Sequence, residues 1–169
     1  MSDAGLPVVT LAIVFATMLA ELKRSRANER VLRAQGAVEP AGDVYRQMQW
    51  SYPAGFALMA LEGLIAGPPR LIVTVAGSVL FVAAKALKYW AIVSLGHRWT
   101  FRVLVPPNAP LVAHGPYVFA RHPNYIAVVG ELVSVAMIVG ARITGPLATL
   151  FFAALIRRRI RVENSALRY

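Results

Sequence analysis

The sequence contains no cysteine, and this absence removes several kinds of chemistry at once. Without a thiol there is no disulfide, no thiolate nucleophile and no cysteine-ligated metal. Histidine is also scarce, and His97, His114 and His122 are too scattered along the chain to indicate a metal site. We therefore expect a protein without a metal centre.

Charged residues are few as well, since they make up 15% of the 169 residues while 57% are hydrophobic. This composition is typical of a protein surrounded by lipid rather than of a soluble domain. Eight acidic residues stand against eighteen Lys and Arg, which gives a net charge of +10. The basic residues cluster at the ends of apolar segments, so they indicate membrane topology and contacts with anionic lipid headgroups, and not a nucleic-acid surface.

Five apolar runs predict an all-α integral membrane helical bundle, a single domain of about five transmembrane helices. The spans are expected near residues 6–22, 50–66, 71–95, 125–141 and 143–160. A polar loop is expected at 23–49, with a short helix at 26–35 that ends at Gly36. The fifth run is short for a crossing, because only the 14 residues 143–156 are free of charge.

The positions of the basic residues predict an orientation. Among the eighteen, only Arg70 and Arg142 fall on one side of the five-span topology. Cytoplasmic loops carry the excess of Lys and Arg, so the N-terminus is expected outside. The C-terminus and the 96–124 connection are then expected on the cytoplasmic face.

Some charged residues lie within the apolar runs. Lys85 and Lys88, near the end of the third run, are expected to extend their long stems to the headgroups. Glu62 is expected to be structural or to lie near the far interface. Glu131 interrupts the fourth run, and the sequence leaves open whether it is paired with a Lys or Arg of a neighbouring helix or acts on a substrate.

The stretch 115–125 is polar and contains two prolines between long apolar runs. Because a residue before proline is disfavoured in a helix, His122 is expected to cap the fourth helix and Pro123 to be its first residue. A helix start carries free N–H groups and partial positive charge, so with Arg121 beside it this corner is expected to attract an anion such as a carboxylate. Equally open is a plainer interpretation, in which Arg121 follows the charge bias of membrane loops and His122 is an incidental cap.

Several motifs together resemble the isoprenylcysteine carboxyl methyltransferase family of integral membrane enzymes. They are Gly115-Pro116-Tyr117, Arg121-His122-Pro123-Asn124-Tyr125, the preceding Leu95-Gly96 with Trp99, and Arg159-Ile160-x-x-Glu163, and they cover roughly residues 85–167. Asn28-Glu29-Arg30, Gly36-Ala37-Val38-Glu39 and Glu131 are more similar to the small bacterial members, some of which act on lipidic phenols or other lipids.

The resemblance implies a methyltransferase that uses S-adenosyl-L-methionine, bound in a cytoplasmic pocket between the Arg-His-Pro segment and the C-terminal tail. The implied acceptor is a lipid or prenylated small molecule, either an isoprenylcysteine-type carboxylate or a lipid phenol. By the match, the cofactor-binding residues would be Tyr117, His122, Asn124, Tyr125, Glu163 and Asn164. The family usually has a second acid where Asn164 stands, and the amide keeps an acceptor but removes a charge.

The match also suggests catalytic residues. Arg121 would orient the substrate. A carboxylate acceptor is already ionised, whereas a phenol of pKa ~10 needs help in losing its proton, for which Glu131, His122 and His97 are the candidates. Arg121 and Glu131 are therefore the predicted catalytic pair.

Two other functions remain open on the sequence. A membrane reductase of the sterol-reductase type has a similar C-terminal region, and it would bind NADPH. The sequence has no evident extra basic cluster for the 2'-phosphate beyond the topology arginines. A non-catalytic scaffold or small transporter, in which Arg121 only anchors a loop, is the third possibility. Nothing in the sequence indicates an oligomeric state.

Overall fold

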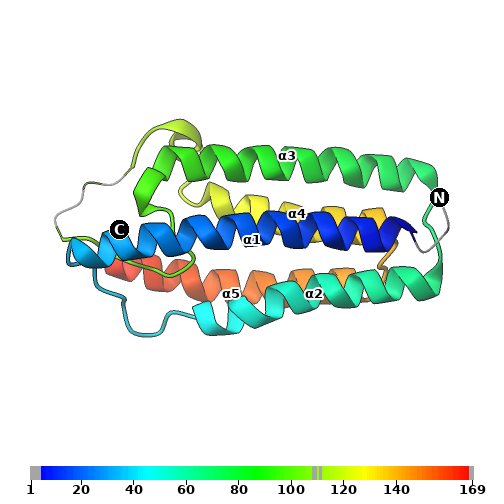
Figure 1. The fold of residues 1–169 in the computed structure, drawn as a ribbon, viewed down its shortest axis with the longest axis horizontal. Coiled ribbons are helices and arrows are strands. Elements are labelled where there is room, and N and C mark those ends of the chain that lie inside the picture. Colours follow the sequence, from blue (N-terminus) through cyan, green and yellow to red (C-terminus); the bar gives the residue numbers. More distant parts are fainter. Residues whose placement is uncertain (1–4, 108–109, 111, 168–169) are drawn as a thin grey trace.

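Five long helices lie side by side as an elongated bundle (Figure 1). The computed structural model describes residues 5–107, 110 and 112–167. The helices are α1 (Gly5–Ala34), α2 (Tyr45–Ala66), α3 (Leu71–Leu95), α4 (Pro123–Val139) and α5 (Thr144–Leu167), with the short 3-10 turns η1 (Gly96–Arg98) and η2 (Gly115–Val118) between α3 and α4. Successive helices run in opposite directions, so the ends of α1, α3 and α5 meet the starts of α2 and α4 at one end of the bundle, here named the motif end.

The helical bundle is confirmed, whereas five membrane crossings stay a prediction. Two of the described helices are long and apolar enough to cross a membrane, namely Gly5–Ala34 and Leu71–Arg98. Helix α4 is apolar but has 17 residues, which span about 25 Å at ~1.5 Å per residue. Helices α2 and α5 each have a polar segment at the motif end, residues 45–49 and 157–163.

The bounds of α3, the start of α4 and the helix at residues 26–34 before Gly36 agree with the sequence prediction, but the predicted break between the first span and that helix is wrong. Helix α1 continues without a break to Ala34 and ends just before Gly36, which has φ +80°. It continues because Ser25, Asn28 and Leu32, along one face, are buried against other parts of the chain. The two buried polar residues, Ser25 and Asn28, have hydrogen-bond partners inside the protein, whereas Lys23 and Arg30 on the other face are exposed.

Helix α4 is central in the bundle. It packs against α1, α2, α3 and α5, and its buried residues Leu132 and Val135 meet Phe56 and Met59 of α2 and Phe152 of α5 in one apolar core. This central position matters for function, because the Arg-His-Pro motif leads directly into α4.

Glu62 is structural, as expected, and it joins α2 to the start of α5 at the end of the bundle opposite the motif. Its carboxylate accepts hydrogen bonds from the backbone N–H groups of Ile143 (2.9 Å) and Thr144 (2.7 Å) and from the Thr144 hydroxyl (2.6 Å). The side chain therefore satisfies donors that the first turn of a helix leaves unpaired.

Replacing Glu62 with alanine is expected to destabilise the fold by about 1–2 kcal/mol, because two backbone donors lose their partner. For a chain of this size, the melting temperature in detergent should fall by roughly 2–8 °C. Glu62→Gln keeps one acceptor oxygen and should lose less. An unchanged melting temperature in Glu62→Ala would show that water replaces the cap without loss.

Candidate functional site

The Arg-His-Pro segment and the C-terminal part of α5 meet at the motif end. His122 precedes the first residue of α4, Pro123, as predicted, but its side chain does not cap that helix. The ring reaches across to α5 instead, with Nδ1 3.2 Å from Glu163 Oε2 and Nε2 3.2 Å from Asn164 Oδ1. The Tyr125 hydroxyl donates to Glu163 Oε1. Two segments about forty residues apart in sequence thus form one polar group.

Glu163 is the centre of this group. Besides Tyr125 and His122 it contacts Arg159, whose Nε lies 3.3 Å from Glu163 Oε1, and Arg159 in turn lies 3.6 Å from Asp43 Oδ1. Burial raises the pKa of the Glu163 carboxyl, but the hydrogen bond from His122, the charge of Arg159 and the hydrogen bond from Tyr125 lower it by more. The pKa of Glu163 therefore lies below its ordinary value, and the group is a carboxylate at neutral pH.

The lowered pKa of Glu163 predicts a pH dependence of stability. A carboxyl whose pKa is lower in the folded state stabilises the fold above its unfolded pKa and loses that contribution as the pH falls through the folded value. We expect the difference in melting temperature between wild type and Glu163→Gln to be constant above pH ~5 and to shrink below pH ~4. Thermal unfolding in detergent, measured above pH ~5 and below pH ~4, tests this. A difference in melting temperature between the two proteins that is the same at both ends of this range would contradict the prediction.

A cavity of about 570 Å³ adjoins this polar group. At the motif end it is lined by the predicted residues Tyr117, Arg121, His122, Asn124, Tyr125 and Glu163. Farther from the motif it is lined by apolar residues of α1 and α2, among them Phe15, Met18, Leu19 and Trp50. Leu19 is 65% exposed and Trp50 70% exposed, so this part of the cavity wall includes apolar residues at the surface of the bundle.

The connection from α3 to α4 lies over this cavity and is held by the extended end of α1. Asn28 donates to the carbonyl of Trp99 (2.7 Å), and Ser25 accepts a hydrogen bond from the backbone of Phe101 (2.8 Å). The Trp99 indole in turn faces Asn124 Oδ1 at 3.4 Å. The part of α1 that the sequence predicted as a polar loop with a separate short helix thus positions one wall of the site.

Glu131, a predicted catalytic residue, is completely buried and is not among the described residues that line the cavity. Its carboxylate lies 3.0 Å from the Lys88 ammonium and 3.3 Å from that of Lys85, and it accepts a hydrogen bond of 2.8 Å from the Tyr52 hydroxyl. These contacts match the pairing that the sequence left open. A catalytic role of Glu131 stays a prediction, and it would have to act through Tyr52 or Lys88, which do line the cavity.

Lys88 corrects one expectation and adds to the site. It does not reach the headgroups, because it is 3% exposed and paired with Glu21 of α1 at 2.9 Å. Glu21 and Lys88 both line the cavity, and neither was among the predicted site residues. The signal was present in the sequence as charges of opposite sign inside the first, third and fourth apolar runs. Among the described residues, no group of three or more His, Asp and Glu side chains is arranged to hold a metal ion.

Comparison with known proteins agrees with the motifs. A sequence model of the isoprenylcysteine carboxyl methyltransferase (ICMT) family matches residues 76–169, more than half of the chain. The chain belongs to the ICMT family. The ICMT match covers α4, α5 and most of α3, and thus both segments that meet at the motif end. Family membership and the apolar helices indicate a membrane protein.

Two relatives of this ICMT-family chain match it over nearly its full length. A Bacillus subtilis (strain 168) protein, named "Uncharacterized protein YpbQ", is 31% identical over 157 residues, which cover 93% of this chain and 94% of the relative. A Haemophilus influenzae "Uncharacterized protein" is 21% identical over 160 residues, covering 94% and 93%. No solved structure gives a significant match. The assignment to the ICMT family thus rests on the family match, and neither relative's name states an activity.

Proposed function

We propose that this ICMT-family protein is a methyltransferase that transfers a methyl group from S-adenosyl-L-methionine to a lipidic acceptor. The observation that carries the proposal is a single cavity that is lined both by the polar group around Glu163 and by apolar residues of α1 and α2. A water-soluble donor would enter at the motif end and a lipid acceptor would enter sideways. The donor supplies an electrophilic methyl group attached to a sulfonium.

The residues at the motif end fit such a donor. The cavity volume of about 570 Å³ lies in the range of small-molecule sites. Glu163 contacts three side chains, and an ionised carboxylate has about four acceptor positions, so it keeps capacity for an ammonium or a hydroxyl group of the donor. Tyr117, Asn124 and Tyr125 add aromatic faces and an amide, and Asn164 supports the ring of His122.

The protein contributes to the reaction chiefly by positioning the donor and the acceptor and by excluding water. Methyl transfer to an oxygen is an in-line displacement, which depends on holding the two reacting atoms at close approach. Arg121, at the cavity wall beside the start of α4, would orient the acceptor, and the apolar walls would keep water away. No covalent intermediate with the protein is needed.

Thermal shift in detergent tests the proposal against the two alternatives. S-adenosylhomocysteine, the demethylated donor, should stabilise the wild type, by ~2.7 kcal/mol at a hundredfold excess over its dissociation constant, and NADPH should not. Stabilisation by NADPH alone would support the reductase, and stabilisation by neither would support the scaffold or transporter. Lipid extracts from cells with and without the gene, compared by mass for one added methyl group, would then identify the acceptor.

Asn164→Glu restores the second acid that the family usually has. Because Asn164 contacts the ring of His122, we expect the affinity for S-adenosylhomocysteine to change by roughly 3-fold or more, while the maximal rate changes less. Calorimetric titration and steady-state kinetics measure the two effects separately. An unchanged donor affinity would mean that the tail does not act on the donor site.

A further inference from the structure

A buried acid from outside the cavity lining completes the polar group around Glu163. Asp43 lies in the turn before α2, and its side chain is 4% exposed. It is not among the described residues that line the cavity, whereas Arg159 and Glu163 are. Arg159 Nη1 lies 3.6 Å from Asp43 Oδ1, and its Nε lies 3.3 Å from Glu163 Oε1. Arg159 therefore lies between two acids, of which only one faces the cavity.

Backbone hydrogen bonds hold the carboxylate of Asp43 in this position. Oδ1 accepts a hydrogen bond from the N–H of Tyr45 at the start of α2 (3.1 Å). Oδ2 accepts one from the N–H of Val103, in the connection between α3 and α4 (2.9 Å). Because both oxygens are held, the carboxylate cannot turn away from Arg159 without losing a hydrogen bond. Asp43 thus links α2, the connection and α5 at the motif end.

The three ionised side chains of this group carry one negative charge in excess. Arg159 contributes one positive charge, and Asp43 and Glu163 contribute one negative charge each. Asn164 follows Glu163 and contacts the ring of His122, but its amide is neutral, so the C-terminal pair supplies a single acid. Without Asp43, the charge of Arg159 would cancel that of Glu163. With Asp43 in place, the negative charge of Glu163 is available to a cation in the cavity.

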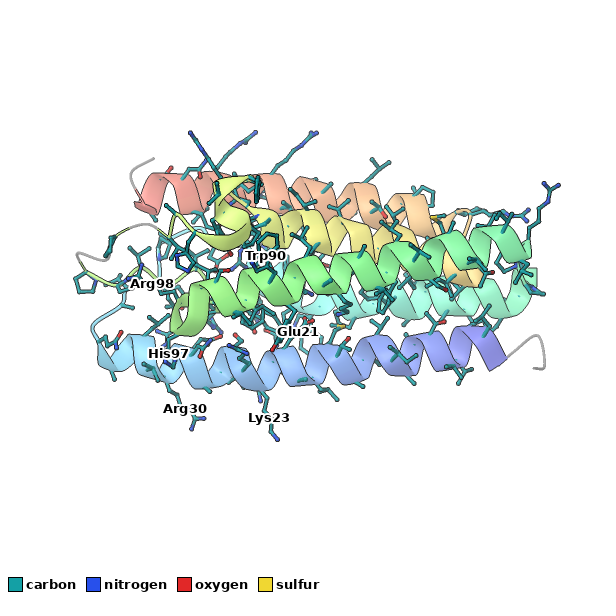
Figure 2. The ribbon with its side chains drawn as sticks, turned by 90° about the horizontal axis from the view of Figure 1, so that it is seen from above. Glu21, Lys23, Arg30, Trp90, His97 and Arg98 are labelled. Atoms are coloured by element: carbon teal, nitrogen blue, oxygen red, sulfur yellow. The ribbon has the colours of Figure 1, made fainter. Side chains whose placement is uncertain are left out.

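A second set of charges in the cavity wall is paired within itself. Lys88 lies 2.9 Å from Glu21 and 3.0 Å from Glu131. Figure 2 shows that Glu21 points from α1 toward the inside of the bundle, whereas Lys23 and Arg30 of the same helix point away from it. These two exposed cations of α1 therefore add no charge to the cavity wall.

The remaining cations of the wall do not alter a comparison between variants of Asp43. Arg102 is paired with Glu39 at 2.8 Å, and Arg98 donates to a backbone carbonyl. Arg121 is assigned above to the acceptor. An imidazole is mostly neutral at pH ~8, where the measurements below are made, so His122 adds little charge. All four cations or rings are kept in every variant, and their effect on a ligand cancels in the comparison.

We propose that Glu163 binds the ammonium group of the methyl donor and that Asp43 is a positioning residue for this contact, because it holds Arg159 and balances its charge. This inference rests on the donor site proposed above. An ammonium group is a compact cation with three donors, and it fits the acceptor positions that Glu163 keeps. The acid that makes the contact possible thus comes from a segment outside residues 76–169, the part that the family match covers.

The first test compares two ligands that differ only in the ammonium group. They are S-adenosylhomocysteine and its analogue in which a hydrogen replaces the amino group, titrated by calorimetry in detergent at pH ~8. The wild type should bind S-adenosylhomocysteine about tenfold more tightly than the analogue. Asp43→Asn keeps the size of the side chain and one acceptor oxygen. It should bind S-adenosylhomocysteine about tenfold more weakly than the wild type does, and the analogue no more weakly. Equal losses for both ligands, or an unchanged affinity for S-adenosylhomocysteine, would overturn the proposal.

The second test adds Arg159→Gln to Asp43→Asn. The double variant loses one positive and one negative charge, so Glu163 again carries the single excess charge, as in the wild type. Its affinity for S-adenosylhomocysteine should return to within about threefold of the wild-type value, although it carries a further substitution. A merely structural role of Asp43 predicts an additional loss instead. A double variant that binds S-adenosylhomocysteine as weakly as Asp43→Asn, or more weakly, would overturn the proposal.

Controls separate this inference from folding and from the proposed function. Glu62→Gln is the matched control, because Glu62 also accepts hydrogen bonds from two backbone N–H groups but lies at the opposite end of the bundle, and the preference for the ammonium group should stay unchanged. If Asp43→Asn does not fold, the double variant still tests the charge count, and loss of the preference in it would overturn the proposal. Absence of S-adenosylhomocysteine binding to the wild type refutes the donor site itself. Binding of both ligands to the wild type with equal affinity refutes only the ammonium contact.

Discussion

Replacing Arg121 with alanine is expected to lower kcat/KM for methyl transfer by about 100-fold to 1,000-fold, the range observed when a group that orients or stabilises the reacting atoms is removed. Arg121 lines the cavity directly before the first turn of α4, where its charge and the helix start act on the same space. The affinity for S-adenosylhomocysteine should change little, because the donor contacts are assigned to other side chains. Steady-state kinetics with a lipid acceptor and calorimetry with the demethylated donor measure the two effects.

Arg158→Ala is the matched control for Arg121→Ala. Arg158 is an exposed arginine of α5 at the same end of the bundle, and it is not among the described residues that line the cavity. Arg158→Ala removes one positive charge, as Arg121→Ala does, and should leave kcat/KM for methyl transfer nearly unchanged. If Arg121→Ala keeps most of the activity, Arg121 has no part in catalysis and the plainer interpretation of its position, a topology charge, is correct.

Gly115→Ala is expected to be the most damaging single methyl addition at the motif end. Gly115 has φ +62°, a left-handed conformation that costs a residue with a side chain ~1–2 kcal/mol. A Cβ there would also overlap the Ser94 side chain of α3 and lie 3.2 Å from the Trp90 indole nitrogen, an overpacking worth a further ~1–3 kcal/mol. The turn η2, which carries Tyr117, would have to move, so both stability and donor affinity should fall.

Ser94→Gly separates the two causes of the Gly115→Ala effect. The double variant, Gly115→Ala with Ser94→Gly, removes the overlap with the Ser94 side chain but keeps the backbone strain at position 115. It should therefore recover part of the stability and part of the donor affinity that Gly115→Ala loses. Thermal unfolding with and without S-adenosylhomocysteine gives both quantities. If Gly115→Ala melts like the wild type, the close packing of η2 on α3 is not required for the site.

The sequence predicted the fold best where local rules decide the structure. The bounds of α3 follow from one long apolar run between Pro69 and Gly96, and the start of α4 follows from the His122-Pro123 pair. The helix at 26–35 was predicted, but its continuity with the first apolar run could not be predicted in this way. It depends on contacts of Ser25 and Asn28 with the connection near residue 100, which no local pattern records.

In the candidate site, too, some contacts could be predicted from sequence motifs and others depend on how the helices pack. The meeting of His122 with Glu163 was predicted, because both motifs were compared with one family and the family implies that they share a pocket. Pairing of Glu131 with a basic residue of a neighbouring helix was one of the alternatives that the sequence left open, but the choice of Lys88 and its second partner Glu21 were missed, because the register between three helices decides which side chains meet. Long stems of lysine near a helix end favour the headgroups in general, but two buried acids offer a closer partner here.

The central claim is that His122 and Tyr125 of the motif and Glu163 of α5 together form one donor site. Calorimetric titration of S-adenosylhomocysteine into the wild type, His122→Ala, Glu163→Gln and the double variant tests it most directly. We expect the wild type to bind, each single variant to lose roughly tenfold or more, and the double variant to lose less than the sum of the two free-energy changes, because the two side chains contact each other. Absence of binding to the wild type, or single variants that bind as tightly as the wild type, would contradict the claim.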